Sequence, residues 1–567
     1  MPRRARLTPD DFAQATWADI QPYYDRLASR ALTARNVKRW LNDWAELEAA
    51  VGEAIALATN AFSANTGDPT LEAAYHRFAG EIQPNCAEQF VRLGTKLLDL
   101  GYESPDLQPS LRNMRNQREI FHEENLALQQ ALQPLDAEYQ RITGEMSTDW
   151  DGERIPLAYL AAHLGSHVRA TRKRAYRKLF GSYAAERDRL ADIFDAQWQL
   201  RQQIAKNAGF ANFRDYAFRE KNRFDYGVAE CLAFHEAVEK EVAPALTRRL
   251  DRHRRQLKTR TVRPWDVRAD PLKRPALSPF QTTDELIERA EAIFRAVNPV
   301  FGDRFALMQR EQLLDLDGRQ GKAPTGFCTS LLFSERPFIF MNAVGTAQDV
   351  MTLIHETGHA MHLFEIFEHQ PPYLRDWPGM EMTELGSMTM ELLAGTFLAR
   401  EHGGFYSDSD ARRARTEHFH FMLEMLVWIA TIDAFQHWIY TDPEGCDRDA
   451  RDEKWREISD RFNTGVDWSG LEPERMAQWY QQIHIFTVPF YFIEYAIAQI
   501  GALQIWQRSL IDREGAVRDY RRALALGNTR PLPELFAAAG ARFAFDRATL
   551  GELVRTIEDE LDRLDGA

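Results

Sequence analysis

The chain has few cysteines for its length, with four among 567 residues. Cys86, Cys231, Cys328 and Cys446 lie far apart, and no two of them form a C-x-x-C pair. Disulfide-stabilised secreted domains and cysteine-based zinc modules both depend on closely spaced cysteines. The sequence therefore predicts neither a disulfide framework nor a structural zinc knuckle.

The chain also lacks an excess of positive charge. It contains 70 Lys and Arg against 84 Asp and Glu, which gives a formal net charge of −14. This balance argues against a general affinity for nucleic acid or for anionic membranes. Residues 248–274 are a local exception. We interpret them as a solvated helix end and loop, with a patch for acidic peptide ends as the alternative.

No long uninterrupted apolar run is present. The basic residues 1–6 lead directly into a predicted helix start at Thr8, and no apolar segment typical of a secretory signal follows. The most apolar stretch, residues 486–506, contains Pro489 and Glu494. A charge near the centre of a bilayer is costly, so a buried helix is the better interpretation. We expect a cytoplasmic protein without a membrane partner.

Helical periodicity dominates the rest of the chain. Strand-like runs are few, near 305–314 and 326–341, and the four prolines between 264 and 279 predict a surface connection. The long amphipathic stretches that predict helices are 37–63, 111–144, 169–207, 228–258, 282–296 and 412–440.

The most informative motif is His355-Glu356-Thr357-Gly358-His359. H-E-x-x-H on a helix puts two imidazoles on one face, where both can bind one Zn²⁺, with the glutamate beside the open coordination position. Apolar or small residues around it predict a buried helix face, and Asp349 is expected to cap the helix start. The alternative is a buried helix in which the two histidines make hydrogen bonds within the protein and bind no metal.

A third ligand is expected downstream, in a second predicted helix. Glu381, Glu384 and Glu391 are candidates, and spacing alone leaves all three open. One carboxylate would complete a His₂Glu set and leave the fourth position to water, as in catalytic zinc sites. The other interpretation of these glutamates is a solvated helix face.

The segments 355–362 and 384–391 together resemble the thimet oligopeptidase and oligoendopeptidase F family of zinc peptidases. In that family the third ligand opens a Glu-x-x-Ser segment about one helix after H-E-x-x-H. The resemblance therefore implies Glu384, 29 positions after His355, as the third ligand of one zinc ion. It places Glu381 outside the ligand set and implies that Glu391 orients a liganding imidazole.

A second segment, residues 482–495, resembles the family's C-terminal helix that carries a histidine and tyrosines. The resemblance implies that His484, Tyr491 and Tyr495 bind substrate and stabilise the oxyanion. Phe490 and Phe492 stand where relatives often have tyrosine, so the division of labour between the two tyrosines stays open. Core packing is the alternative role for each tyrosine.

The resemblance covers residues 326–506 most strongly. It implies a mainly α, two-lobed, helical zincin-type metallopeptidase with a small β-sheet beside the active-site helix and a deep cleft. We expect a helical lobe over residues 1–200 and a catalytic zinc region over 201–567. Residues 337–341 are predicted to form an edge strand that pairs with the peptide backbone.

The predicted function is zinc-dependent hydrolysis of internal peptide bonds in short oligopeptides. Metal-activated water is the expected nucleophile, Glu356 the general base, and Tyr495 with His484 the donors to the oxyanion. One alternative is a zinc carboxypeptidase or dipeptidyl carboxypeptidase, which would remove residues only from the C-terminus. A more remote alternative is a peptide-binding protein without turnover.

Overall fold

The computed structural model describes residues 7–463 and 465–566, and the chain divides into two compact units. Unit 1 comprises the chain up to Glu119, Leu277–Arg415 and Ala498–Phe543. Unit 2 comprises Ile120–Ala276, Thr416–Ile497 and the chain from Ala544. Each of the predicted ranges 1–200 and 201–567 contributes residues to both units. The assignment of catalysis to residues 201–567 stays a prediction, as does the deep cleft.

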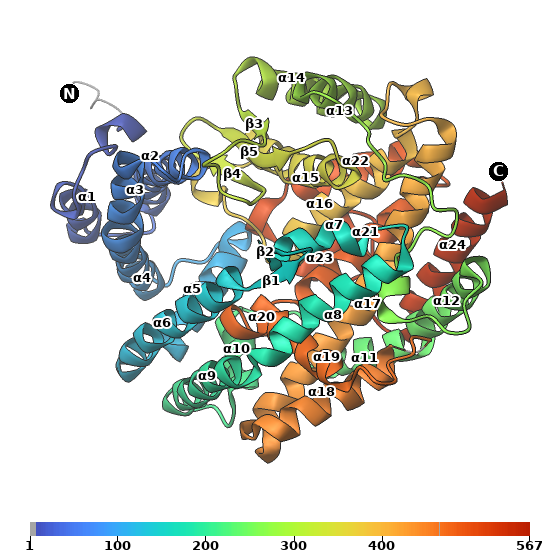
Figure 1. The fold of residues 1–567 in the computed structure, drawn as a ribbon. Coiled ribbons are helices and arrows are strands. Elements are labelled where there is room, and N and C mark those ends of the chain that lie inside the picture. Colours follow the sequence, from blue (N-terminus) through green and yellow to red (C-terminus); the bar gives the residue numbers. More distant parts are fainter. Residues whose placement is uncertain (1–6, 464, 567) are drawn as a thin grey trace. The chain divides into compact units, whose positions relative to one another are not determined.

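Both units are built mainly from helices, as predicted (Figure 1). In the N-terminal part of unit 1, Trp40 and Trp44 of the long second helix lie in an apolar core. The predicted helix start at Thr8 is a single 3₁₀ turn, Pro9–Asp11, and residues 1–6 lie outside the described residues. The helices of this part are α1 (Trp17–Ser29), α2 (Val37–Ala64), α3 (Pro69–Arg77), α4 (Gln83–Asp99) and α5 (Gln108–Ile120).

The rest of unit 1 contains a three-stranded sheet that packs against one long helix (Figure 1). The strand order is β3-β5-β4, with β5 parallel to β3 and antiparallel to β4. The elements are α13 (Thr283–Val297), α14 (Pro299–Arg310), β3 (Leu314–Asp317), β4 (Phe327–Leu331), β5 (Arg336–Ala343), α15 (Ala347–His369), α16 (Met380–Ala394), α22 (Arg513–Leu524) and α23 (Leu532–Ala538).

Two predictions for this region were wrong. Residues 337–341 belong to β5, which is the central strand and is paired on both sides, so they form no free edge. The strand predicted near 305–314 is largely α14, which Asn298 caps by accepting a hydrogen bond from the backbone N–H of Val300. Phe301, Phe305 and Met308 are spaced for one helix face and are buried on it, so helical burial outweighed their strand propensity.

Unit 2 is also helical, apart from a two-stranded hairpin. The predicted helices 111–144 and 169–207 are each divided in two, at residues 121–122 and at Glu186, and the predicted helix 228–258 contains a π-helical turn, Val238–Val242. The elements are α6 (Glu123–Glu145), β1 (Ser147–Trp150), β2 (Glu153–Pro156), α7 (Leu160–Leu164), α8 (Arg169–Ala185), α9 (Arg187–Asn207), α10 (Phe213–Glu220), α11 (Val228–Ala237), α12 (Ala243–Leu257), α18 (Arg448–Phe462), α19 (Glu472–Met476), α20 (Ile483–Thr487) and α24 (Arg547–Gly566).

Two further helices, α17 (Asp408–Thr441) and α21 (Ile493–Ser509), contribute residues to both units. Among the described residues, α17 alone is long and apolar enough to span a bilayer, and 67% of its apolar window is buried in the protein. Such burial is typical of a core helix. The apolar stretch 486–506 lies mainly in α21, whose residues up to Trp506 are largely buried.

The segment predicted as one histidine-and-tyrosine helix is interrupted. His484 lies on α20, Tyr491 lies in the connection, and Tyr495 lies on α21. Pro489 has no backbone N–H for a helix, and Phe490 has a φ of 62°, in the left-handed region.

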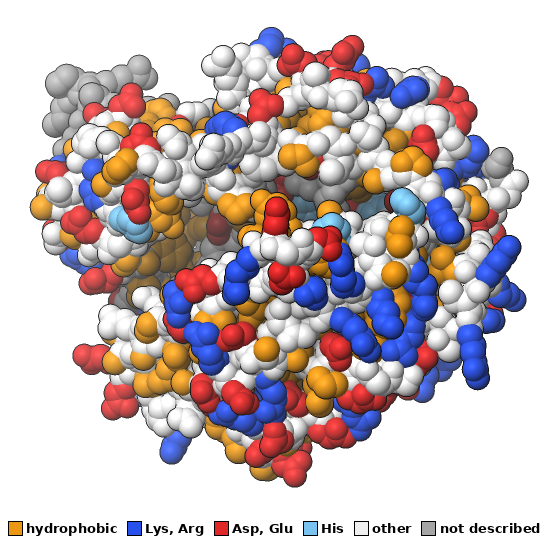
Figure 2. Space-filling view, viewed as in Figure 1, with side chains coloured by type: hydrophobic (Ala, Val, Ile, Leu, Met, Phe, Trp, Pro, Cys, Tyr) orange, Lys and Arg blue, Asp and Glu red, His pale blue; other side chains and the backbone are white. Residues whose placement is uncertain are grey.

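The basic residues near 248–274 lie at the end of α12 and in the loop that follows, as expected. Figure 2 shows Lys and Arg side chains gathered over α8 and α12 on one face of the protein. Several of these arginines are ion-paired, for example Arg248 with Glu558 and Arg252 with Asp562, at 2.9 Å each. Their pairing agrees with a solvated, charge-balanced surface.

Candidate metal centre

The helix that carries H-E-x-x-H begins two residues before the predicted cap. The N-cap of α15 is Thr346, whose hydroxyl accepts a hydrogen bond from the backbone N–H of Asp349. The Asp349 carboxylate accepts hydrogen bonds from the backbone N–H groups of Thr346 and Val344, at 2.8 and 2.9 Å. Asp349 therefore stabilises the helix start as the third residue of a capping box and not as the cap itself.

Three predicted ligands converge within unit 1. His355 and His359 lie one turn apart on α15, and Glu384 lies on the neighbouring helix α16. The Glu384 Oε2 atom is 3.3 Å from His355 Nε2 and 3.7 Å from His359 Nε2. One ligand atom from each residue lies within 4.8 Å of the other two.

This spacing fits a tetrahedral metal ion. Zinc bonds of about 2.0–2.2 Å place neighbouring ligand atoms roughly 3.3–3.6 Å apart. The charge balance also favours a cation, because Glu356 and Glu384 are buried and Glu391 is partly buried around two imidazoles. Buried carboxylates are costly unless opposite charge lies beside them.

A further layer of hydrogen bonds orients the ligands. The Glu391 Oε1 atom is 2.6 Å from His355 Nδ1, which leaves Nε2 of that ring facing Glu384. The Ser387 hydroxyl donates a hydrogen bond to Glu384 Oε2 at 3.0 Å. This role of Ser387 was not predicted, although the Glu-x-x-Ser spacing puts the two side chains one helical turn apart. Glu381 does not belong to the group of converging ligand atoms.

The two histidines differ in their titration. Burial lowers the pKa of His355, but the Glu384 and Glu391 carboxylates outweigh it, and the pKa lies well above its ordinary value. Burial lowers the pKa of His359 to about 4, against the opposing effect of Glu384. His359 is therefore neutral near pH 7, as a metal-binding imidazole must be.

Glu356 lies beside this group and has an unusual carboxyl group. Burial raises the pKa of Glu356 to about 7; the His355 ring opposes this shift, and the Glu384 and Glu391 carboxylates add to it. The backbone N–H of Cys328, on β4, donates a hydrogen bond to the Glu356 carboxylate. A carboxyl group that titrates near neutrality is suited to accept and return a proton.

The close approach of α15 and α16 depends on a glycine. A Cβ atom at Gly358 would lie 2.5 Å from the Cα of Ser387 and 3.0 Å from the carbonyl oxygen of Gly386. No side chain fits at that distance. Gly358 of the motif therefore lets the backbone of α16 pass close enough for Glu384 to reach the two histidines.

The three predicted substrate residues come together in unit 2. The rings of His484 and Tyr491 are stacked with centroids 5.9 Å apart, and Tyr495 packs edge-on against both, at 6.3 and 5.3 Å. Burial lowers the pKa of His484 to about 4, and Lys221 adds to the shift. His484 is thus neutral near pH 7, and its Nδ1 lies 2.6 Å from Gln482 Nε2.

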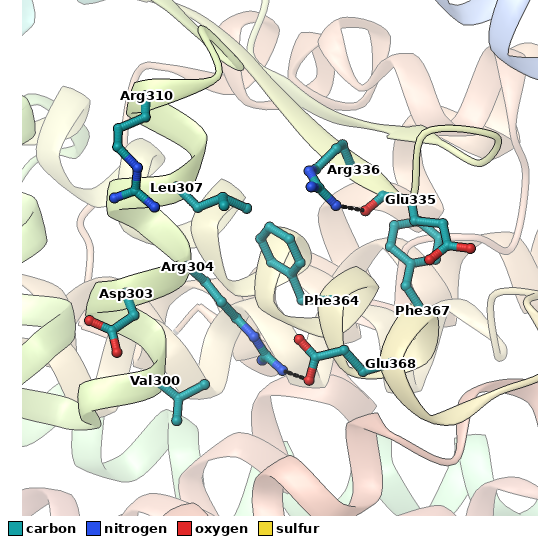
Figure 3. Close-up of a pocket in the computed structure, with 10 residues that line it drawn as sticks. All are labelled: Val300, Asp303, Arg304, Leu307, Arg310, Glu335, Arg336, Phe364, Phe367 and Glu368. Carbon is teal, nitrogen blue, oxygen red and sulfur yellow. Dashed lines mark hydrogen bonds and ion pairs between the residues drawn. The ribbon is translucent and has the colours of Figure 1, made fainter.

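A pocket of about 390 Å³ elsewhere in unit 1 is separate from these groups. It lies against the C-terminal half of α15, and Arg304 reaches Glu368 at 2.7 Å beside it (Figure 3). Glu365 and Glu368 also approach His369, but Arg304 and Arg521 already pair with Glu365 at 2.7 Å each. The carboxylates of this cluster are therefore neutralised by arginine.

Comparisons with known proteins give one family model and several relatives. Residues 162–554 match the family model described as peptidase family M3. The chain is 23% identical over 258 residues to the chromosomal oligoendopeptidase F of Lactococcus lactis subsp. cremoris, a match that covers 44% of this chain and 40% of that relative. The chain thus spans about two fifths of the length of that curated relative.

Solved structures match over nearly the whole chain. A structure of PZ peptidase A with an inhibitor has a TM-score of 0.86 and 25% identity, and the match covers 97% of this chain and 98% of that one. Oligoendopeptidase F from Enterococcus faecium has a TM-score of 0.62 at 14% identity, with 97% of both chains covered, and shows the fold alone. The mainly helical fold predicted from the sequence is confirmed.

We predict that Gly358→Ala separates α15 from α16 and weakens metal binding. Overpacking of this kind costs about 1–3 kcal/mol in folding free energy. Thermal unfolding and zinc content, measured by mass spectrometry of the metal, test the prediction. Gly395→Ala is the matched control, because an added Cβ there meets no atom within 4 Å. Equal zinc content and stability in both variants would contradict the packing argument.

Proposed function

Because the chain belongs to peptidase family M3, we propose that it is a zinc-dependent oligoendopeptidase that hydrolyses internal peptide bonds in short oligopeptides. The observation that carries the proposal is the convergence of His355, His359 and Glu384 beside Glu356. Two imidazoles and one carboxylate form the donor set of a catalytic zinc site, which keeps one position open.

His355, His359 and Glu384 would hold the ion, and Glu391 and Ser387 keep His355 and Glu384 in their binding orientation. When bound, the zinc ion polarises the scissile carbonyl and lowers the pKa of water at the open position. Glu356 accepts a proton from the attacking water and then delivers it to the leaving amine. Burial of Glu356 raises its proton affinity, which favours acceptance of the proton, and a pKa of about 7 still allows the group to release it.

The outer edge of the sheet offers a binding mode for the peptide backbone. Within the described part of the chain, β4 pairs with β5 on one side only, and the backbone N–H of Cys328 on β4 donates to the Glu356 carboxylate. An extended peptide added beside β4 would lie next to the proposed general base. Main-chain hydrogen bonds of this kind give affinity with little side-chain preference.

We also propose that His484, Tyr491 and Tyr495 act on substrate, as the family resemblance implies. Their packing into one aromatic cluster within unit 2 supports a shared role. A tyrosine hydroxyl is a suitable donor to an oxyanion, and we assign that role to Tyr495.

The rival functions make different products. A carboxypeptidase or dipeptidyl carboxypeptidase would remove residues only from the C-terminus, and a peptide-binding protein would release no product. Mass spectrometry of a ladder of peptides, from a few residues to an unfolded protein, separates these cases. We expect internal cuts confined to short peptides. Stepwise loss from the C-terminus, or intact peptides despite full zinc occupancy, would reject the oligoendopeptidase assignment.

A cytoplasmic location fits a peptidase of short peptides, and we propose it here. Fractionation of the producing cells tests this part of the proposal. Recovery of the native protein only from the membrane or the culture medium would contradict it.

Glu356→Gln is expected to keep zinc and to lose activity by about 10²–10⁴-fold, the usual contribution of a general acid–base group. Glutamine keeps the shape of the side chain but cannot accept the proton. Steady-state kinetics and zinc content are measured together. His359→Ala is the companion variant and should lose both zinc and activity; near-normal turnover in Glu356→Gln would remove Glu356 from the mechanism.

Glu391→Gln is expected to weaken zinc affinity by about 10–100-fold, the usual effect of removing a group that orients a metal-binding histidine. The measurement is competition for zinc against a chelator of known affinity. Glu381→Gln serves as the control on the same helix, because Glu381 lies outside the converging ligand atoms. Equal zinc affinity in the two variants would remove the orienting role of Glu391.

Tyr495→Phe is expected to lower kcat by about 10²–10³-fold with little change in KM, because only the transition state carries the oxyanion. Tyr491→Phe, which removes the neighbouring hydroxyl, is the matched control and should alter KM more than kcat. The opposite pattern would exchange the roles of the two tyrosines, and no effect in either would leave both as packing residues.

A further inference from the structure

A second group of potential metal ligands lies in unit 2, on two helices that the proposed mechanism does not use. α11 carries Cys231 and His235, and α17 carries Asp433 and His437. Both pairs have i, i+4 spacing, which puts the two side chains of each pair on one face of its helix. The two faces meet, because His235 Nε2 lies 2.8 Å from Asp433 Oδ2.

The ligand atoms of Cys231, Asp433 and His437 converge. One atom from each residue lies within 4.8 Å of the other two, and all three side chains are buried. His437 Nε2 lies 3.4 Å from Asp433 Oδ2, close to the separation of neighbouring ligands around a tetrahedral ion. The His235 and His437 rings pack edge-on, with centroids 5.5 Å apart.

Several polar atoms of this group lack hydrogen bonds. Asp433 Oδ1 and His437 Nδ1 have no hydrogen-bond partner among the described residues, and His437 Nε2 has only its 3.4 Å contact with Asp433 Oδ2. Asp433 is 0% exposed and His437 is 5% exposed, so bulk water does not readily satisfy them. Buried polar groups in native proteins are nearly always paired, and an ion bound among Cys231, Asp433 and His437 would supply a partner.

Charge and donor type select the ion. A thiolate, a carboxylate and a neutral imidazole around Zn²⁺ give a site with no net charge, which is the least costly arrangement in an apolar interior. The mixture of sulfur, nitrogen and oxygen donors suits Zn²⁺ better than Mg²⁺ or Ca²⁺, which prefer oxygen alone.

We propose that unit 2 contains a second, structural Zn²⁺ site formed by Cys231, Asp433 and His437, with His235 hydrogen-bonded to Asp433. The fourth position belongs to a water molecule, because His235 Nε2 is used in its hydrogen bond with Asp433. The ion joins α11 to α17 and takes no part in hydrolysis. From the sequence we expected one zinc ion and no structural zinc knuckle, because the cysteines lie far apart and form no C-x-x-C pair. Cys231 and Asp433 are about 200 positions apart in the chain.

Cobalt substitution separates the two sites. The full-length protein is produced in medium in which cobalt replaces zinc, and metal content and the ultraviolet absorption spectrum are measured. Only the second site has a sulfur ligand, so it alone gives a thiolate-to-cobalt charge-transfer band. We expect two ions per chain and this band. One ion per chain without the band would overturn the proposal and leave a buried Asp–His hydrogen bond in its place.

Variants assign the band to its ligand. Cys231→Ala should lose the band and one ion but keep peptidase activity. Cys328→Ala is the control, because Cys328 lies near Glu356 and outside the second site; this variant should keep the band and both ions. His359→Ala should lose one ion and keep the band, so failure of the proposed peptidase function does not affect this test. If Cys231→Ala does not fold, the wild-type spectrum and metal content decide. A band that persists in Cys231→Ala would exclude Cys231 as the ligand.

Discussion

The close contact between α15 and α16 is the constraint on which the candidate metal centre depends. At Gly358 the two backbones are so near that a single added carbon would overlap Ser387. This separation brings the Glu384 carboxylate to within hydrogen-bonding distance of His355. The glycine in the variable part of H-E-x-x-H is thus as important to the geometry as the ligands, although it contacts no metal itself.

Electrostatics in this region follows from the same packing. The carboxylates of Glu356, Glu384 and Glu391 are brought together around two imidazoles in a largely buried space. Burial raises the pKa of Glu356, and the charges of Glu384 and Glu391 add to the shift, while the same two carboxylates raise the pKa of His355. A divalent cation would replace the proton on His355 and balance the carboxylates.

Local patterns predicted most elements correctly and failed where long-range packing decided the outcome. The amphipathic period predicted a helix over residues 37–63, and the observed helix α2 covers Val37–Ala64. Residues 337–341 were read correctly as a strand, but their central place in the sheet depends on β3 and β4. The interruption between α20 and α21 was not predicted, because the family resemblance implied one continuous helix. Pro489 lies in this interruption, and a proline disfavours the interior of a helix.

Spacing within one helix was sufficient to predict that His355 and His359 lie together, because helix geometry alone places residues four apart on one face. The choice of Glu384 over its neighbours needed the family resemblance, and its distance to the histidines came only from the packed structure. Nothing in the sequence indicated that Cys231 and Asp433 lie near each other. Their helices, α11 and α17, are adjacent only in the tertiary fold. Periodicity within one helix shows which face is apolar, but it does not show which distant helix packs against that face.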